Sequence, residues 1–414
     1  MSPAPPSVIA ELQEHLSKLA LAIEAQKEIL RDLEKQRSQA LSRLNDCFDP
    51  IARLPLELQS EIFLCCLPSN ELTVNTRGPP ILFLRVSRLW RDIALATPKL
   101  WAHLSIAFPR HSLDLCESWI KRAQHLPLSL TLRGDLVLGD RALELLDDWA
   151  QQLQHLSLDV GTSRDADWSM RYICIVEDLP CLKTLSISSS DDIYFYDADN
   201  WLEILDAAPE LVQLNLRIGS SEQSRSRLAS SEPLVHESLE RLQLPDPKGV
   251  LQYITLPGLK ELSLQFIDFD QEHLKAFLTR SSPTLVYWDL NPPLQWSPVM
   301  TDCLRLVPSL VHLFLRIGDN NTNIITLLAT PSSNILPNLC HLTLQPYFTI
   351  RPEDVDPIIR MLSVRRLASA DFRKLESFRL IDRDPPNSDF AAALGKLAED
   401  GMNIRVGKSR EDVE

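Results

Sequence analysis

The stretch IARLPLELQSEIFLCCLP, residues 51–68, and the stretch ILFLRVSRLWRDIALATPKLWAHL, residues 81–104, organise the N-terminal part of this chain. Each predicts a helix, because large apolar side chains recur at helical spacing. Pro55 suits the first helical position, where a missing N–H costs nothing, and Pro68 ends the first helix. Thr97 ends the second, because a residue before proline is pushed out of the helical region. The apolar residues concerned are Leu58, Ile62, Phe63, Val86, Leu89, Trp90 and Ile93, followed by Leu100 and Trp101.

Helices this short cannot bury so many large side chains by themselves. They either pack on the rest of the chain or leave part of their surface open for a partner. The order LPxEL, EIF, VSRLWRDIA and TPKLW resembles an F-box, in the form common in fungal F-box-like proteins. Two features depart from the family: Ser87 stands where cysteine is frequent, and the loop over residues 68–80 is longer than in compact F-boxes. The matching residues are Leu54, Pro55, Glu57, Leu58, Ile62, Phe63, Val86, Arg88, Trp90, Arg91, Ile93, Ala94, Pro98, Leu100 and Trp101.

The resemblance implies an F-box-like domain over residues 51–104 that binds the Skp-type adaptor of an SCF ubiquitin ligase and, through it, a cullin. An F-box subunit positions a target and carries out no bond chemistry itself, so its contribution is effective concentration. The residues that the resemblance assigns to the adaptor contact are Leu54, Pro55, Leu58, Ile62, Phe63, Val86, Trp90, Ile93, Leu100 and Trp101.

The composition narrows the remaining function classes. A formal net charge of −14 over 414 residues argues against a general nucleic-acid or anionic-membrane binder. No basic region precedes an apolar segment at the start, and no apolar stretch approaches the roughly 20 residues of a membrane span. We therefore expect a cytoplasmic or nuclear protein. The eight cysteines form no CxxC pair and are interpreted as reduced thiols, and only 11 glycines disfavour phosphate-binding loops.

The N-terminal segment divides into a flexible leader, residues 1–8, and a coiled-coil-like helix, residues 9–48. Nine of eleven residues in a heptad frame of this helix are apolar, which is the pattern of a coiled-coil seam. Two interpretations stay open: the helix joins two copies of the chain or binds a partner helix, or it folds back on its own chain. The frame consists of Ile9, Leu12, Leu16, Leu19, Ile23, Gln26, Leu30, Leu33, Arg37, Ala40 and Leu44.

The rest of the chain contains a repeat. The pattern LxxLxL, in some units with another large residue replacing a leucine, recurs nine times at intervals of 20 to 36 residues, with helical stretches such as 201–208, 272–279 and 300–307 between the copies. Each strand of this kind buries its apolar face only against its neighbours, so the pattern predicts an α/β solenoid with a parallel sheet. It resembles leucine-rich repeats over about 128–406. The pattern starts at Leu153, Leu182, Leu211, Leu239, Leu259, Leu285, Leu310, Leu339 and Leu375.

The solenoid domain is expected to span residues 105–406, ending in a helix over 390–399 and an edge strand over 403–406, with a disordered tail over 407–414. Repeat positions three, five and seven should face the concave side, where a target protein could bind. Tyr, Phe and Arg side chains there have the composition of an interface hot spot, although the same positions could simply line a solvated sheet face. We assign target binding to Arg217, Tyr287, Asp289, His312, Phe314, Arg316 and His341, among neighbours that include Gln213, Asn215, Arg241, Gln243, Glu261 and Ser263.

Catalytic and metal motifs do not emerge from the sequence. His312 and His341 fall on neighbouring strands, but no cysteine or carboxylate at predictable spacing completes a zinc site. The patterns GxSxG and HExxH and the kinase signatures are missing from the sequence. We expect no enzymatic activity, cofactor or metal. Two functions remain: a substrate receptor of an SCF-type ubiquitin ligase, or a scaffold dimerised by the N-terminal helix with the F-box-like helices as a structural cap.

Overall fold

The computed structural model describes two compact units, which are treated separately below. The first consists of Met1–His103 with Trp119–Leu126, and the second of Leu104–Ser118 with Pro127–Glu414. The described residues are 6–68, 77–108, 113–134, 148–160, 178–189, 198–217, 232–244, 250–264, 270–292, 296–318, 322–330, 334–347, 349–367, 372–382, 384, 386 and 388–409. The stretch DRALELLDDWA also predicts a helix, over 140–150, and it lies mostly outside the described residues, as do residues 1–5 and 410–414.

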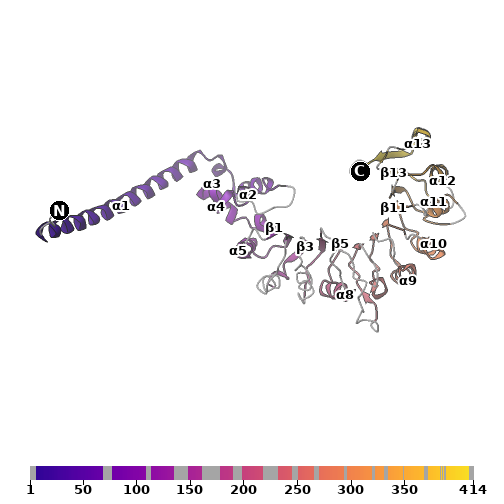
Figure 1. Ribbon diagram of the computed structural model, residues 1–414, viewed down its shortest axis with the longest axis horizontal. Coiled ribbons are helices and arrows are strands. Elements are labelled where there is room, and N and C mark those ends of the chain that lie inside the picture. Colours follow the sequence, from indigo (N-terminus) through magenta and orange to yellow (C-terminus); the bar gives the residue numbers. More distant parts are fainter. Residues whose placement is uncertain are drawn as a thin grey trace. The chain divides into compact units, whose positions relative to one another are not determined.

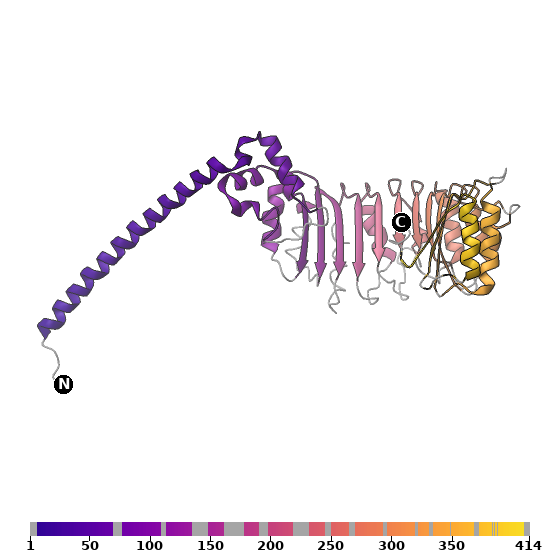
Figure 2. The same cartoon turned by 90° about the horizontal axis from the view of Figure 1, so that it is seen from above.

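The first unit is all-helical. Figures 1 and 2 both show α1 as one long uninterrupted helix, which begins three residues earlier than the helix expected from residue 9. Within the described residues, no helix in the structure is long and apolar enough to cross a membrane. The elements are α1 (Pro6–Phe48), η1 (Pro50–Arg53), α2 (Leu56–Cys65), α3 (Phe83–Val86), α4 (Arg88–Leu95) and η2 (Pro98–Trp101), with the end of α5 (Leu113–Ala123).

Two capping side chains fix where these helices begin. The Asp49 carboxylate accepts a hydrogen bond from the Ile51 amide at 2.9 Å, and the Ser87 hydroxyl accepts one from the Trp90 amide at 3.1 Å. Ser87 has extended backbone angles, φ −151° and ψ 172°, and so divides the single helix expected from the second stretch into α3 and α4. Pro55 occupies the N-cap of α2, one position before the predicted one.

An aromatic cluster holds the three short helices together. The ring centroids of Phe63 in α2 and Phe83 in α3 are 4.3 Å apart, and Trp90 in α4 lies 5.0 and 5.8 Å from them. The indole N–H of Trp90 donates to the Asp49 carboxylate at 2.6 Å. The cluster therefore buries apolar rings while its one polar group is satisfied.

A pair of indoles forms a second aromatic contact in this unit, around η2. Trp101 is fully buried and stands edge-on to Trp119, with centroids 5.0 Å apart. The Trp101 N–H donates to the Ala94 carbonyl at 2.8 Å, and the Trp119 N–H donates to the Trp101 carbonyl at 3.0 Å. The Arg122 guanidinium lies 4.6 Å from the centroid of the Trp101 ring. These contacts assign Trp101 to the core of the unit.

The second unit is a leucine-rich-repeat-like α/β solenoid, as expected. Its twelve-stranded sheet has the order β1-β2-β3-β4-β5-β7-β9-β10-β11-β12-β13-β14, and Figure 2 shows its strands side by side. From β2 to β14 every neighbouring pair is parallel. A separate two-stranded sheet joins β6 (Leu234–Val235) and β8 (Ile254–Thr255). The main strands are β1 (His103–Phe108), β2 (Leu128–Gly134), β3 (Leu153–Val160), β4 (Thr184–Ser189), β5 (Gln213–Arg217), β7 (Arg241–Leu244), β9 (Glu261–Leu264), β10 (Tyr287–Leu290), β11 (His312–Ile317), β12 (His341–Pro346), β13 (Ser377–Ile381) and β14 (Asn403–Gly407).

Helices cover one side of this sheet in Figure 1. The stretches expected to be helical at 201–208, 272–279, 300–307 and 390–399 are confirmed, with ends that differ by a few residues. The helices are α8 (Ala198–Ala207), α9 (Gln271–Ser281), α10 (Pro298–Arg305), α11 (Thr322–Leu328), α12 (Pro352–Arg365) and α13 (Ser388–Glu399), with a 3-10 turn η4 (Leu251–Tyr253). The last strand reaches Gly407, one residue into the predicted tail.

Buried side chains form a continuous ladder across the strands. Position four of each repeat lies beside its equivalent in the next strand, and every member from β3 to β13 is at most 4% exposed. Burying a leucine of this kind contributes roughly 1.5–3 kcal/mol, so the ladder contributes strongly to the stability of this unit. Its members are Leu156, Leu185, Leu214, Leu242, Leu262, Trp288, Leu313, Leu342 and Phe378.

Candidate functional site

The three short helices of the first unit expose large apolar side chains. Leu58 and Ile62 lie four residues apart on α2, and 52% and 39% of their surfaces are exposed. Gln59 and Phe63, one residue further on, point inward and are buried. The exposed large apolar residues on and beside these helices are Leu56, Leu58, Ile62, Leu82, Val86 and Leu95, which we call the α2–α4 apolar surface.

The α2–α4 apolar surface sits on a rigid base. The side-chain amide of Gln59 donates to the carbonyls of Leu54 and Ile51, at 2.7 and 3.0 Å, which fastens α2 to η1. The guanidinium of Arg91 donates twice to the Leu84 carbonyl, at 2.8 and 3.0 Å, which fastens α4 to α3. Leaving such apolar area in water is unfavourable, so this surface has the character of a partner-binding site.

The structure divides the ten residues assigned to adaptor binding into three groups. Leu58, Ile62, Val86 and Pro55 are exposed, and Leu54 and Trp90 are half-buried. The assignment of the other four is wrong for a contact surface, because at most 2% of each is exposed and they hold the helices together. These four are Phe63, Ile93, Leu100 and Trp101. The exposure of Leu56, Leu82 and Leu95 was not predicted from the sequence. The signal was their position on the helices, which lies away from the apolar stripe that is buried.

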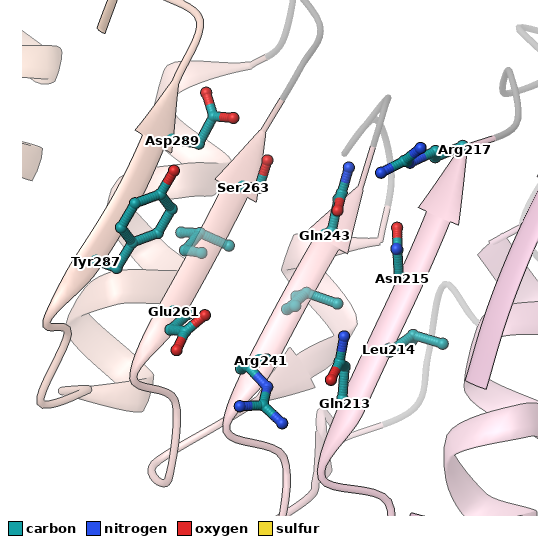
Figure 3. Close-up of a pocket in the computed structure, with 12 residues that line it drawn as sticks. Gln213, Leu214, Asn215, Arg217, Arg241, Gln243, Glu261, Ser263, Tyr287 and Asp289 are labelled. Carbon is teal, nitrogen blue, oxygen red and sulfur yellow. The ribbon is translucent and has the colours of Figure 1, made fainter. Parts of the chain in front are cut away.

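The polar face of the sheet carries the second candidate surface. Repeat positions three, five and seven point away from the buried ladder, as expected, and Figure 3 shows those of β5 to β10 on one face. A groove of about 170 Å³ crosses this face. Neighbouring strands place its residues in two rows, spaced about 4.8 Å apart: Gln213, Arg241, Glu261 and Tyr287 in one, and Asn215, Gln243, Ser263 and Asp289 in the other.

Two polar atoms in this groove are unsatisfied. The Asn215 amide oxygen and the Ser263 hydroxyl are buried and make no hydrogen bond to any described residue. Buried polar atoms are normally paired. Arg217 and Arg241, on the neighbouring strands β5 and β7, are exposed, and so is Glu261 on β9. The groove therefore offers charged side chains of both signs to a polar ligand, while the two unpaired atoms are closed off from solvent.

At the β10 side of the groove, the structure corrects part of the target-binding assignment. Only 2% of Asp289 is exposed, and it binds the Arg316 guanidinium through both oxygens, at 2.9 and 3.3 Å. Phe314 is 5% exposed and packs with Ile381 and Tyr287, while Arg316 lies 5.2 Å over its ring. These residues bind one another, so Asp289 and Phe314 are not available to a target.

A loop residue that the sequence analysis missed closes the same region. The hydroxyl of Tyr347, which follows β12, donates to the side-chain oxygen of Asn291, and Asn291 is itself buried. Burial raises the pKa of the Tyr347 phenol. No strand periodicity marks this position, so the sequence carries no signal for the contact.

The two histidines on β11 and β12 do meet, but not as metal ligands. The rings of His312 and His341 are stacked, with centroids 4.2 Å apart and planes inclined by 15°. Stacked rings do not direct their nitrogens at one point, and His341 shares a hydrogen bond of 2.8 Å with the Ser377 hydroxyl. No metal-binding group of three side chains occurs in the described ranges. Burial, followed by the charges of His341 and Arg379, lowers the pKa of His312.

Fold and surfaces together define a non-uniform leucine-rich-repeat-like solenoid preceded by a small helical unit. No protein-family model matches the sequence, and no curated protein matches it. One chain of the crystal structure titled as the Rad7 and Elc1 complex in yeast is similar, with 13% sequence identity and a TM-score of 0.43. The similarity covers 97% of this chain and 98% of that chain. We transfer no property from so distant a likeness.

Proposed function

We propose that the chain is a substrate-receptor subunit of an SCF-type ubiquitin ligase. In this proposal the α2–α4 apolar surface binds a Skp-type adaptor, which connects the chain to a cullin, and the polar face of the sheet binds a target protein. The chain positions the target and performs no bond chemistry. The proposal places it in the cytoplasm or the nucleus.

One observation carries the proposal: the residues that the F-box resemblance assigns to an adaptor are partly exposed on folded helices. Leu58, Ile62 and Val86 are 39–52% exposed although Phe63, Phe83 and Trp90 behind them form a closed aromatic cluster. Covering an apolar side chain that is half exposed removes further apolar area from water, and this contributes favourable free energy to partner binding.

Co-purification with a Skp-type adaptor tests this function. Leu58→Arg and Ile62→Arg place a charge in the proposed contact without touching the aromatic cluster, so both should lose the adaptor while keeping the circular dichroism of the wild type. Leu21→Arg is the matched control, because Leu21 is 73% exposed on α1 and lies outside the surface. Wild-type adaptor binding by folded Leu58→Arg and Ile62→Arg chains would reject the assignment.

The polar groove is the proposed target site. Arg217 and Arg241 are exposed, and Glu261 beside Arg241 adds a carboxylate, so the groove can bind charged side chains of a target. In co-precipitation of targets found with the wild-type chain, Arg217→Glu should lose the target but keep the adaptor. Leu58→Arg should do the opposite, losing the adaptor but keeping the target, which would show that the two sites are distinct.

A second candidate function is a scaffold dimerised by the N-terminal helix, with the F-box-like helices as a structural cap. The exposure of Leu58 disfavours the cap, because a cap would bury it. Dimerisation has its own support: six apolar heptad residues of α1 are 46–65% exposed, so none of them is folded back against the chain. We therefore keep dimerisation through α1 as part of the proposal.

A further inference from the structure

The helix α1 presents an unpaired apolar seam along most of its length. It has 43 residues, which corresponds to roughly 65 Å. An exposed helix of this kind gains little from propensity alone and is normally stabilised by packing its apolar stripe on a partner. The exposed seam residues are Leu16 (65%), Leu19 (46%), Ile23 (52%), Leu30 (57%), Leu33 (56%) and Leu44 (54%).

Two polar residues interrupt the apolar seam, and they distinguish a parallel from an antiparallel pairing of two α1 helices. Gln26 and Arg37 occupy core positions of the heptad frame. In a parallel, in-register dimer each residue faces its own copy, so two Arg37 side chains would meet in the seam. Like charges in contact are destabilising, and polar core residues of coiled coils are known to fix register and orientation.

One antiparallel register pairs the two polar residues with each other. When Gln26 faces Arg37 of the second copy, the amide oxygen of Gln26 can accept from the guanidinium. Because the two copies are related by a twofold axis, Arg37 of the first copy also faces Gln26 of the second. In the same register the remaining seam layers are apolar: Leu19 faces Leu44, Ile23 faces Ala40, and Leu30 faces Leu33.

The flanking positions favour the same register. Lys27 then lies beside Glu34 of the second copy, and symmetry makes this ion pair occur twice. A shift by one heptad in either direction brings Lys27 to Lys27 or Glu34 to Glu34 instead. Within its own helix Lys27 contacts Glu24 at 2.8 Å, but both side chains are more than half exposed, so that pair is weak.

We propose that α1 joins two copies of the chain as an antiparallel coiled coil in which Gln26 faces Arg37 and Lys27 faces Glu34. This inference deepens the dimerisation proposed above and rests on it. It is independent of adaptor binding, because the seam and the α2–α4 apolar surface share no residue.

Charge reversal in the full-length chain tests the register by sedimentation equilibrium. Lys27→Glu and Glu34→Lys each turn both ion pairs into repulsions, so each variant should dimerise at least about fivefold more weakly. Mixing the two variants restores both pairs and should give a mixed dimer at wild-type strength. Glu28→Lys, at an outward position, is the control and should change nothing. Failure of the mixed variants to recover would overturn this register.

Spin labels of a non-cysteine type test the orientation. Labels at Lys18, on the outer side of α1, should be about 40 Å apart in the antiparallel dimer, whereas labels at Asp32 should lie within about 20 Å. Short distances at both Lys18 and Asp32 would mean a parallel dimer. This result would overturn the antiparallel arrangement but not dimerisation itself. A chain that stays monomeric would overturn dimerisation as well, while Leu58→Arg would still report on the adaptor contact.

Discussion

The buried guanidinium of Arg365 makes the sharpest prediction about the stability of the solenoid. Arg365 ends α12, is 2% exposed, and donates to the carbonyls of Leu328, Ile335 and Leu336 at 2.9, 2.7 and 3.0 Å. Its guanidinium also lies 4.6 Å over the Phe372 ring. It therefore ties the end of α11 and residues 335–336 of the preceding repeat to α12.

The expected effect of Arg365→Met follows from two opposing terms. Three charge-assisted hydrogen bonds are lost, each contributing about 1.5–3 kcal/mol, and three buried carbonyls are left unpaired. Against this, burial lowers the pKa of Arg365 to about 10, so removing the buried cation recovers roughly 3 kcal/mol. The net destabilisation is about 1.5–6 kcal/mol, which is at least roughly tenfold in the unfolding equilibrium of this region.

Urea unfolding of the full chain, followed by circular dichroism, measures this effect. Arg366→Met is the matched control, because the neighbouring Arg366 is partly exposed and pairs with Asp400 at the surface. An Arg365→Met chain that unfolds at the same urea concentration as the Arg366→Met chain would refute the reasoning, since the three bonds would then contribute nothing net.

Three further predictions concern single side chains of the solenoid. Gly258→Ala should unfold at a lower temperature than the wild type, because a Cβ at this position would collide with the Glu237 carbonyl oxygen. Gly395→Ala is the control: a Cβ there meets nothing within 4 Å, so the variant should gain up to about 1 kcal/mol of helix stability. Equal melting temperatures for the two variants would contradict this prediction. Burial lowers the pKa of His312, so the unfolded chain binds more protons in acid than the folded chain does, and stability should fall as the pH drops below about 6.5. The fall should be smaller in His312→Gln, which lacks the titrating group. Identical melting curves at pH 5.5 and 7.5, for the wild type and for the variant, would exclude a contribution of His312 to the pH dependence. Phe314→Ala should destabilise the chain by about 2–4 kcal/mol in urea, as a buried ring does, and an unchanged midpoint would show that the ring is not part of the core.

The interaction surfaces show where sequence reasoning fails. Leu58, Ile62 and Val86 proved exposed as required, but Phe63 and Ile93 have the same helical spacing and proved buried. Periodicity identifies an apolar face without saying which neighbour covers it. On a helix with apolar residues over more than half its circumference, only the packing of the other helices separates core from contact surface.

The solenoid face shows the same limit for polar residues. The alternation in each LxxLxL unit predicted which positions point away from the ladder, and the register confirms it. That Asp289 and Phe314 would nevertheless be buried could not be predicted, because their cover comes from Arg316 and Ile381 on other strands. The strand β1 (His103–Phe108) was also missed, although its alternating Leu104 and Ile106 are a strand signal.

The sequence by itself determined the fold class, the order of the two kinds of domain, the repeat and the heptad seam of α1, since these depend on local periodicity. Only the tertiary structure decided which apolar helix residues remain open, which polar residues of the sheet pair with each other, and that Arg365 ties α12 to the preceding repeat. Those outcomes depend on contacts between residues that are 20 to 40 positions apart or more, and side-chain spacing along the chain does not encode which of them will touch.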